Sequence, residues 1–396
     1  MLRLFQKTMS QGSALLFLSA LTAACSTLFL LSLNYFFGLF TENLWLVFVL
    51  PGFGVLCLWT FDQLSSILST SHLSFESIVD DRAESAKNLG WGSVLLILVS
   101  SSLSQLFGAS TGREGTAIQY GACLGRAIAK LQMKIFNSQD QDLLVRAGMV
   151  AGFSSLFGTP VAALVFLGER FGFKQTSEDS IKWAAVSYLS FYFSEIFKAH
   201  HTHYPAWPNM NWDFKVLFSF GVLFLMIFLA AVFYKKIMGF IFHFGYKYFQ
   251  RSYYRIFFAG SLLAFFTILV GSSKYNGLGV SLIQQSFASI SPWYDAILKS
   301  VFTLISITSG FKGGEVTPLM SIGASLGSSL SASLDLPLIA ASAVGCIFFF
   351  AQILGIPLTG AVLMIELFGS SSAPTAFCFG LILWGFKKSK FHHLTL

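Results

Sequence analysis

Two short stretches of the chain place a carboxylate beside a cation, and both are rich in glycine. Residues 110–116 read STGREGT and contain Arg113 and Glu114, and residues 310–318 read GFKGGEVTP and contain Lys312 and Glu315. Glycine lets backbone N–H groups approach a ligand closely, and the start of a helix presents such groups to an anion. A carboxylate there can occupy the anion's own position when ionised and leave it when protonated. The residue types therefore predict anion binding coupled to proton transfer.

Each stretch runs into an expected helix, from Thr116 onward and from Pro318 onward, and proline is permitted in a first helical turn. The alternative is a structural role, in which each glutamate only neutralises the positive N-terminal end of a helix dipole. Ionisable residues within membrane segments are expensive and usually functional, so we favour the functional interpretation of Glu114 and Glu315.

The surrounding sequence is that of an all-α polytopic membrane protein. It is 55% hydrophobic and 11% charged, with 45 Phe, whereas soluble domains are roughly a quarter charged. Several apolar runs reach the ~20 residues that a membrane helix needs. The runs are 13–40, 44–61, 183–197, 216–234, 256–271, 336–369 and 373–386. The first is too long for a cleaved signal peptide and is predicted to be the first membrane helix.

The charges and cysteines exclude other classes. The five cysteines stand singly in apolar segments, so no metal or disulfide site is indicated. The net charge of +7 is spread between apolar runs, which indicates membrane topology rather than nucleic-acid binding. Basic residues at both ends and in an expected loop at 235–255 place these parts in the cytoplasm, and 199–214 outside.

The two glutamate stretches belong to an internal repeat. GREGT aligns with GGEVT, YGACLG with IGASLG, and GTPVAALVFLGERF with GIPLTGAVLMIELF, in the same order and at nearly constant separation. The charge pattern gives the halves, 1–205 and 206–396, opposite orientations. Two inverted-topology repeats predict a transporter whose broken helices meet near the membrane midplane.

The motifs resemble those of the CLC family of chloride channels and chloride/proton antiporters. Its GREGP loop corresponds to residues 112–116, with Thr116 in place of proline, and its GxFxP loop corresponds to residues 314–318, with Glu315 in place of an apolar residue. This pairing looks like the CLC-F clade of bacterial fluoride/proton antiporters. The resemblance implies the CLC fold, a homodimer in the cell inner (plasma) membrane, and no cofactor or metal.

The resemblance also assigns residues. Glu114 corresponds to the external gating glutamate and Glu315 to the clade's additional glutamate, both in gating and proton transfer. Arg170 stands where chloride/proton exchangers carry an inner glutamate, which is consistent with a proton route through Glu315. The residues implied in anion binding are Gly112, Arg113, Gly115, Thr116, Gly314, Val316 and Thr317.

Two elements of the family pattern are not recognisable in the sequence. The first anion-coordinating loop is expected near 69–77, where Ser74 and Phe75 are candidates, with packing as the alternative. No tyrosine follows Tyr294, so His392 or His393 substitutes at the inner gate, or that gate is open.

We therefore expect a fluoride/proton antiporter that moves fluoride and protons across the lipid bilayer, with a chloride channel or chloride/proton exchanger as the alternative. An enzyme is not expected, because the segments carry no Ser/His, HExxH or carboxylate-pair motif.

Overall fold

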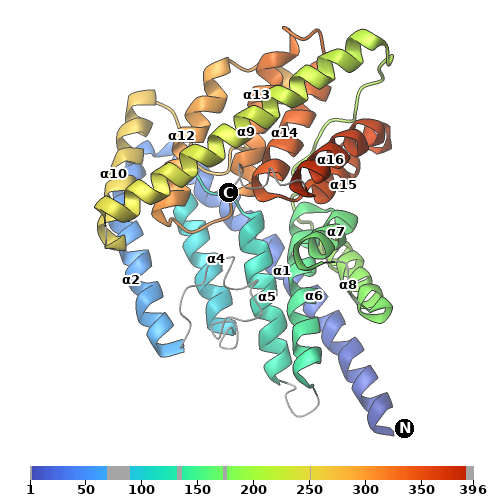
Figure 1. The fold of residues 1–396 in the computed structure, drawn as a ribbon. Helices are drawn as coiled ribbons and strands as arrows, with labels where there is room; N and C mark the ends of the chain where they lie inside the picture. The colour runs from blue at the N-terminus through green and yellow to red at the C-terminus, as the bar shows by residue number, and fades with distance from the viewer. Residues whose placement is uncertain (1, 69–89, 132–135, 173–175, 250, 389–396) are drawn as a thin grey trace. The chain divides into compact units, whose positions relative to one another are not determined.

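The computed structural model describes residues 2–68, 90–131, 136–172, 176–249 and 251–388. Every regular element in these ranges is a helix (Figure 1). The prediction of an all-α protein is confirmed.

The chain forms two compact units, each assembled from separate segments. Unit 1 comprises Met1–Phe36, Leu56–Leu103 and Arg113–His201, and unit 2 comprises Phe37–Val55, Ser104–Gly112 and Thr202–Leu396. The first glycine-rich loop is therefore divided: its residues through Gly112 belong to unit 2, and those from Arg113 onward belong to unit 1. The repeats at 1–205 and 206–396 remain a prediction about internal symmetry.

The first half of the chain supplies the helices of unit 1 and parts of unit 2. In chain order its helices are α1 (Leu2–Glu42), η1 (Leu44–Val49), α2 (Leu50–Leu68), α4 (Trp91–Leu106), α5 (Glu114–Leu131), α6 (Ser138–Phe157), α7 (Pro160–Phe171) and α8 (Ser177–Ile196). The end of α1, all of η1, the start of α2 and the end of α4 belong to unit 2. Within unit 1, α5 and α6 lie side by side (Figure 1).

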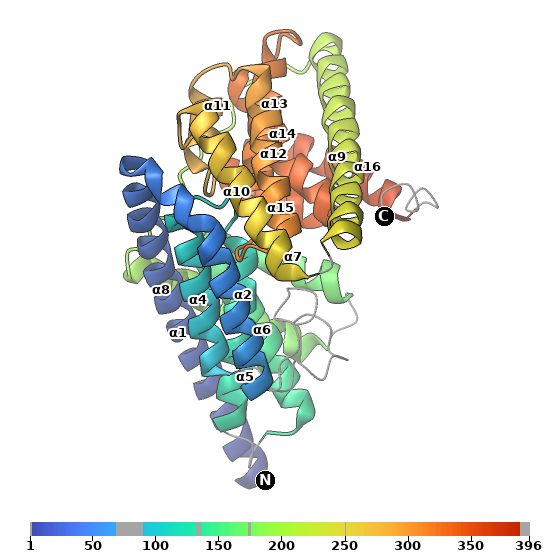
Figure 2. The same ribbon diagram turned by 90° about the vertical axis from the view of Figure 1, so that its left-hand side faces the viewer.

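The second half supplies the remaining helices of unit 2. They are α9 (Phe214–Tyr248), α10 (Ser252–Val270), α11 (Val280–Ala288), α12 (Trp293–Ser309), α13 (Val316–Ser331), α14 (Leu338–Leu354), α15 (Pro357–Phe368), η3 (Ser370–Ser372) and α16 (Ala373–Lys388). Helix α9 packs against α12, α13 and α14, and Figure 2 shows it as one long continuous helix.

Helix α9 corrects one expectation about topology. The sequence predicted a loop at 235–255, but α9 continues to Tyr248 and α10 begins at Ser252. Its 35 residues span about 52 Å at the usual rise of about 1.5 Å per residue. The segment 235–248 holds no proline and several good helix formers, so nothing local ends the helix where its charges begin.

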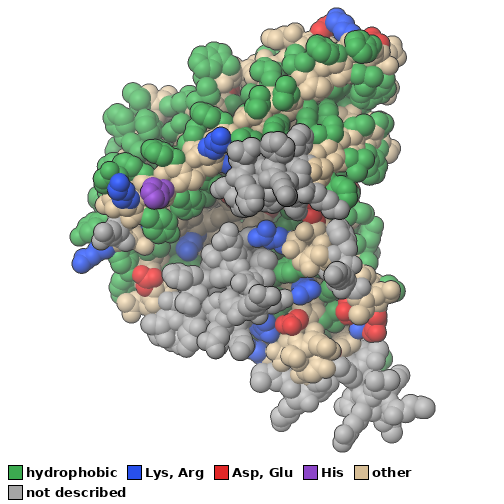
Figure 3. Space-filling view, viewed as in Figure 1, with side chains coloured by type: hydrophobic (Ala, Val, Ile, Leu, Met, Phe, Trp, Pro, Cys, Tyr) green, Lys and Arg blue, Asp and Glu red, His purple; other side chains and the backbone are tan. Residues whose placement is uncertain are grey.

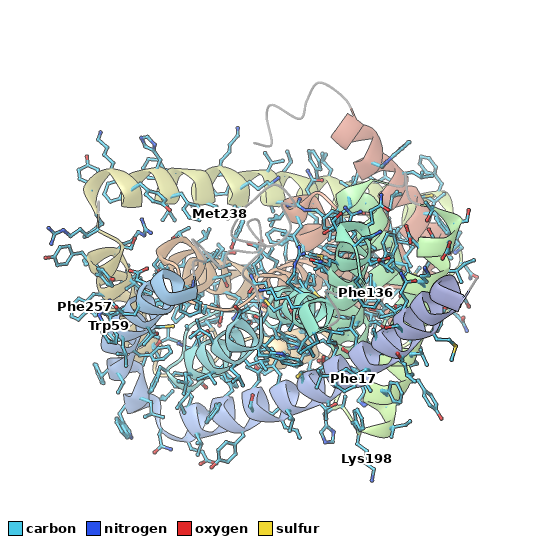
Figure 4. The ribbon with its side chains drawn as sticks, turned by 90° about the horizontal axis from the view of Figure 1, so that it is seen from below. Phe17, Trp59, Phe136, Lys198, Met238 and Phe257 are labelled. Carbon is cyan, nitrogen blue, oxygen red and sulfur yellow. The ribbon has the colours of Figure 1, made fainter. Side chains whose placement is uncertain are left out.

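Apolar side chains cover much of the surface. Among the described residues, four helical stretches are long and apolar enough to cross a membrane: Met9–Glu42, Leu44–Gln63, Phe214–Tyr248 and Ser252–Val270. Phe17 on α1 is 53% exposed and Phe257 on α10 is 52% exposed (Figure 4). Hydrophobic side chains also lie over most of α9, and basic ones gather toward its C-terminal end (Figure 3). This is the surface of a multi-pass membrane protein.

Close helix packing recurs in the two units. A Cβ on Gly121 of α5 would collide with the carbonyl of Gly148 on α6, and a Cβ on Gly323 of α13 would collide with the carbonyl of Gly345 on α14. Small residues let helix backbones approach closely. The two segments aligned in the sequence, YGACLG and IGASLG, therefore each allow a close helix–helix contact within their own unit.

The following helices match as well. Gly158 and Gly355 both have left-handed backbones, with φ of 74° and 67°. Two residues later, Pro160 and Pro357 each begin a helix of 12 residues, α7 and α15. Proline has a backbone angle suited to the first helical position and no N–H to leave unpaired. The aligned sequences thus form equivalent local structures.

Candidate functional site

A backbone bridge joins the two glycine-rich loops within unit 2. Gly112 and Gly314 form an antiparallel β-bridge. The N–H of Gly314 donates to the carbonyl of Gly112 at 2.8 Å, and the N–H of Gly112 donates to the carbonyl of Gly314. A Cβ on Gly112 would lie 2.8 Å from Cδ of Pro318, which is too close for any other residue. The glycines of both motifs are required here by the approach of two main chains.

Side chains next to the bridge strengthen the contact. Thr111 Oγ1 donates to the carbonyl of Lys312 at 3.3 Å, and Gln105 Nε2 donates to the carbonyl of Thr111 at 2.7 Å. The Thr111 side chain also lies where a Cβ on Gly313 would have to go. The residues that precede both glutamates are therefore held in one place by main-chain and side-chain bonds.

A buried lysine that sequence reasoning missed fixes the start of the first loop. Lys299 on α12 is fully buried, and its Nζ donates to Ser110 Oγ at 2.9 Å and to the carbonyl of Gly277 at 2.8 Å. Its remaining acceptors are backbone carbonyls at Tyr275 and Asn276, so no carboxylate in the described chain neutralises it. The only hint in the sequence is a lysine in the middle of a helix that carries one other charged residue, Asp295.

Ser110 is held from a second side by the same helix. Its N–H donates to Ser306 Oγ at 2.9 Å, and its Oγ lies 3.0 Å from Thr303 Oγ1. Lys299, Thr303 and Ser306 occupy one face of α12, because residues three and four apart lie next to each other on a helix. Helix α12 is thus the support of the first loop.

In unit 1, Glu114 is the first residue of α5, two residues earlier than the sequence predicted for the helix start. Its side chain is 2% exposed and its Oε1 lies 3.2 Å from Nε of Arg113. The backbone N–H of Arg113 also donates to Oε2 at 3.3 Å. The Glu114 carboxylate is therefore folded back onto its own loop by an ion pair of low exposure.

Thr116 lies in the first turn of α5 and is buried. Its Oγ1 lies 3.4 Å from Ser101 Oγ of α4. This hydroxyl pair ties the first turn of α5 to α4 within unit 1.

Glu315 lies directly before α13 and is half-buried. Its side chain makes no capping hydrogen bond to that helix. The carboxylate interacts electrostatically with Tyr234 and Lys235, which are adjacent residues of α9. Sequence reasoning identified Glu315 but missed both neighbours, because they lie in another helix about 80 residues away along the chain.

Some predicted site residues cannot be placed. Ser74, Phe75, His392 and His393 lie outside the described residues. Within the described part of the chain, no group of three or more His, Cys, Asp and Glu side chains could hold a metal ion.

The comparisons with known proteins agree with these motifs. The family model described as voltage gated chloride channel matches residues 69–383. A chloride/fluoride channel protein from Pseudomonas syringae pv. tomato is 33% identical over 368 residues, which cover 90% of this chain and 79% of that protein. An H⁺/Cl⁻ exchange transporter from Vibrio parahaemolyticus is 24% identical over 318 residues, which cover 73% of this chain and 65% of that protein.

Solved structures show the same fold. The crystal structure of a CLC-type fluoride/proton antiporter matches with a TM-score of 0.88 and 24% identity, covering 96% of both chains. That of a slow cyanobacterial Cl⁻/H⁺ antiporter matches with a TM-score of 0.79 and 16% identity, covering 97% of both chains. The fold class predicted from the motifs, the CLC fold, is confirmed.

Proposed function

Since this chain belongs to the voltage-gated chloride channel family, we propose that it is a secondary transporter that exchanges fluoride for protons and exports fluoride from the cytoplasm. The relative at 33% identity is described as a chloride/fluoride channel protein, which supports fluoride as a substrate. Chloride/proton exchange is the second candidate, because H⁺/Cl⁻ exchange transporters also match the chain.

The observation that carries the proposal is the bridge between Gly112 and Gly314. Glu114 follows the bridge by two residues and Glu315 follows it by one. A transporter that couples an anion to protons needs ionisable groups at the anion's path, and this bridge links the two loops that carry them. Gly112 and Gly314 act in the proposal as the close-packed backbone of the anion site.

In this proposal the first turn of α5 in unit 1 and that of α13 in unit 2 each present ligands to an anion within their own unit. First-turn N–H groups have no partner within their own helix and carry roughly half a positive charge together. Gly115 and Thr116 lie in the first turn of α5, and Val316 and Thr317 in that of α13.

Protons are carried by the two glutamates. An ionised Glu114 is attracted to Arg113 and competes with the anion, whereas a protonated Glu114 loses that attraction and can leave. Fluoride beside Glu315 adds a like charge, which favours protonation of the carboxyl group. The protonated group then donates a hydrogen bond to the ion, so anion binding and proton uptake are linked at one residue.

Fluoride suits such a site better than chloride does. It is small, strongly hydrated and a strong hydrogen-bond acceptor, so its site must replace water with donors. Backbone amides, the Thr317 hydroxyl and a protonated carboxyl group are such donors. Fluoride also enters cells as HF and ionises in a near-neutral cytoplasm, so proton-coupled export counters its accumulation.

The proposed setting is the cell inner (plasma) membrane, with both termini in the cytoplasm and two copies in a homodimer. The basic residues near both ends support the orientation, and Lys235, Lys236 and Lys247 mark the cytoplasmic part of α9. The dimer rests on the family resemblance.

Anion efflux from proteoliposomes tests the function. Purified protein is reconstituted with fluoride or chloride inside, and the external anion and pH are recorded together. We expect fluoride to leave at least about tenfold faster, equivalent to ~1.4 kcal/mol, with protons moving in the opposite direction. Equal initial rates would favour the chloride exchanger, and fluoride efflux that moves no protons would exclude exchange.

A further inference from the structure

The hydroxyl group of Tyr234 is buried and has no hydrogen-bond partner among the residues that the structure describes. Tyr234 lies on α9, is 4% exposed, and its Oη finds no acceptor or donor in the described structure. Buried polar groups are nearly always hydrogen-bonded, because leaving one unpaired costs free energy. An unpaired tyrosine hydroxyl therefore calls for a partner that the described part of the chain does not supply.

The ring of Tyr234 is held firmly. It packs edge-to-face against Phe349 of α14, with the ring centroids 5.7 Å apart and an interplanar angle of 75°. Helix α9 also packs against α13, the helix that Glu315 precedes. The hydroxyl is thus a fixed group on a packed helix, and its position does not depend on a loop.

The electrostatic surroundings of the hydroxyl indicate what its partner is. The Glu315 carboxylate interacts with Tyr234 but does not accept its hydrogen bond. Lys235, the next residue of α9, interacts with the same carboxylate. Three groups favour a negative charge at this place: the hydroxyl donor, the lysine and the first turn of α13. When an anion binds there, the Glu315 carboxylate is the group that can take up a proton.

We propose that Tyr234 is a ligand of the transported anion: its hydroxyl donates a hydrogen bond to fluoride bound beside Glu315. This inference rests on the proposed function, and it adds a side-chain donor from α9 to the donors of α13. A phenol donates strongly to a compact anion, so Tyr234 also contributes to the preference for fluoride over chloride.

Tyr234→Phe tests the proposal, because it removes the hydroxyl and keeps the ring against Phe349. Tyr248→Phe is the matched control: Tyr248 lies on the same helix and is 61% exposed. The rate of fluoride efflux is measured on the wild-type protein and on both variants. Their thermal stability is measured separately, with and without fluoride.

We expect Tyr234→Phe to raise the KM for fluoride about tenfold or more, as for loss of a hydrogen bond to a charged group, with a smaller change in kcat. The KM for chloride should change less. Without fluoride the variant should be as stable as the wild type or more stable, since the lost hydroxyl had no partner, and its stabilisation by fluoride should shrink. Tyr248→Phe should match the wild type throughout.

Three results would overturn the inference. An unchanged KM would exclude Tyr234 as a ligand. A fall in stability without fluoride, or failure to fold, would show that the hydroxyl has a structural partner such as a bound water. An equal rise in the KM for fluoride and for chloride would show that Tyr234 does not contribute to the preference for fluoride. Failure of the wild-type protein to transport fluoride would instead reject the proposed function, so the two failures are distinguishable.

Discussion

The Nζ of Lys299 lies 2.9 Å from the Oγ of Ser110, although the two residues are 189 positions apart in the chain. The same ammonium reaches the turn between α10 and α11 through the carbonyl of Gly277. One fully buried side chain therefore fastens the first glycine-rich loop to a distant turn of the same unit.

Replacing Lys299 with methionine should destabilise the protein. Methionine fills a similar volume but leaves the carbonyl of Gly277 without its lysine donor and Ser110 Oγ with Thr303 alone, at about 1–3 kcal/mol for a buried group left unpaired. The apparent melting temperature in detergent measures this loss. Lys236→Met, at an exposed position of α9, should leave it unchanged. A stable Lys299→Met protein with normal transport would show that the loop is held by other contacts.

Glu114→Gln should abolish proton coupling, because a neutral amide neither carries a proton nor pairs with Arg113 as an ion. A fluoride gradient should then drive no proton movement in proteoliposomes, whatever rate of fluoride flux remains. Glu195→Gln, which alters an exposed carboxylate of α8, is the control and should couple normally. Uphill proton movement in Glu114→Gln would exclude this residue as a carrier.

Substitutions of Glu315 should separate binding from coupling. Glutamine keeps a hydrogen-bond donor, so Glu315→Gln should bind fluoride but lose coupled exchange, whereas Glu315→Ala should lose both. Fluoride-dependent thermal stabilisation and proton flux, measured on the two variants side by side, make the comparison. If Glu315→Ala retained coupled antiport, the proton path would have to run through Glu114 alone.

The close helix packing predicts equivalent effects in the two units. Gly121→Ala and Gly323→Ala each place a methyl group against a backbone carbonyl, and forced overpacking costs about 1–3 kcal/mol. Each should lower the apparent melting temperature. Gly239→Ala on α9 has open space around its Cβ and should be neutral or stabilising by roughly 0.5–1 kcal/mol. A tolerant Gly323 beside an intolerant Gly121 would contradict the equivalence of the repeats.

The sequence predicted those parts of the fold that depend on local pattern. Apolar runs located α1, α2, α8, α9, α10 and α14 to α16 but not α4, α6, α11 or α12. The recurring glycines and prolines marked the starts of α7 and α15. It failed at α9, where charged residues indicated a loop although no proline interrupts the helix. Charge pattern reports on topology, and long basic side chains are compatible with helix.

The site shows the same limit. Glu114 and Glu315 were predictable because each lies in a distinctive motif. Lys299 and Tyr234 were not, since their significance comes from partners on other helices: Ser110 for the first and Glu315 for the second. A lysine or tyrosine in an apolar run has no local signal that tells which group it faces.

The bridge between Gly112 and Gly314 couples the two loops mechanically through their backbones. Its two hydrogen bonds are made by main-chain atoms alone, so among the natural residues only proline would delete one of the donors. A side chain at Gly112 would also collide with Pro318, so mutation cannot separate the hydrogen bonds from the packing. An amide-to-ester exchange at Gly314 would remove one of the two donors and add no side chain. Residues that determine ion selectivity can therefore change in either loop while the backbone hydrogen bonds between the loops stay the same.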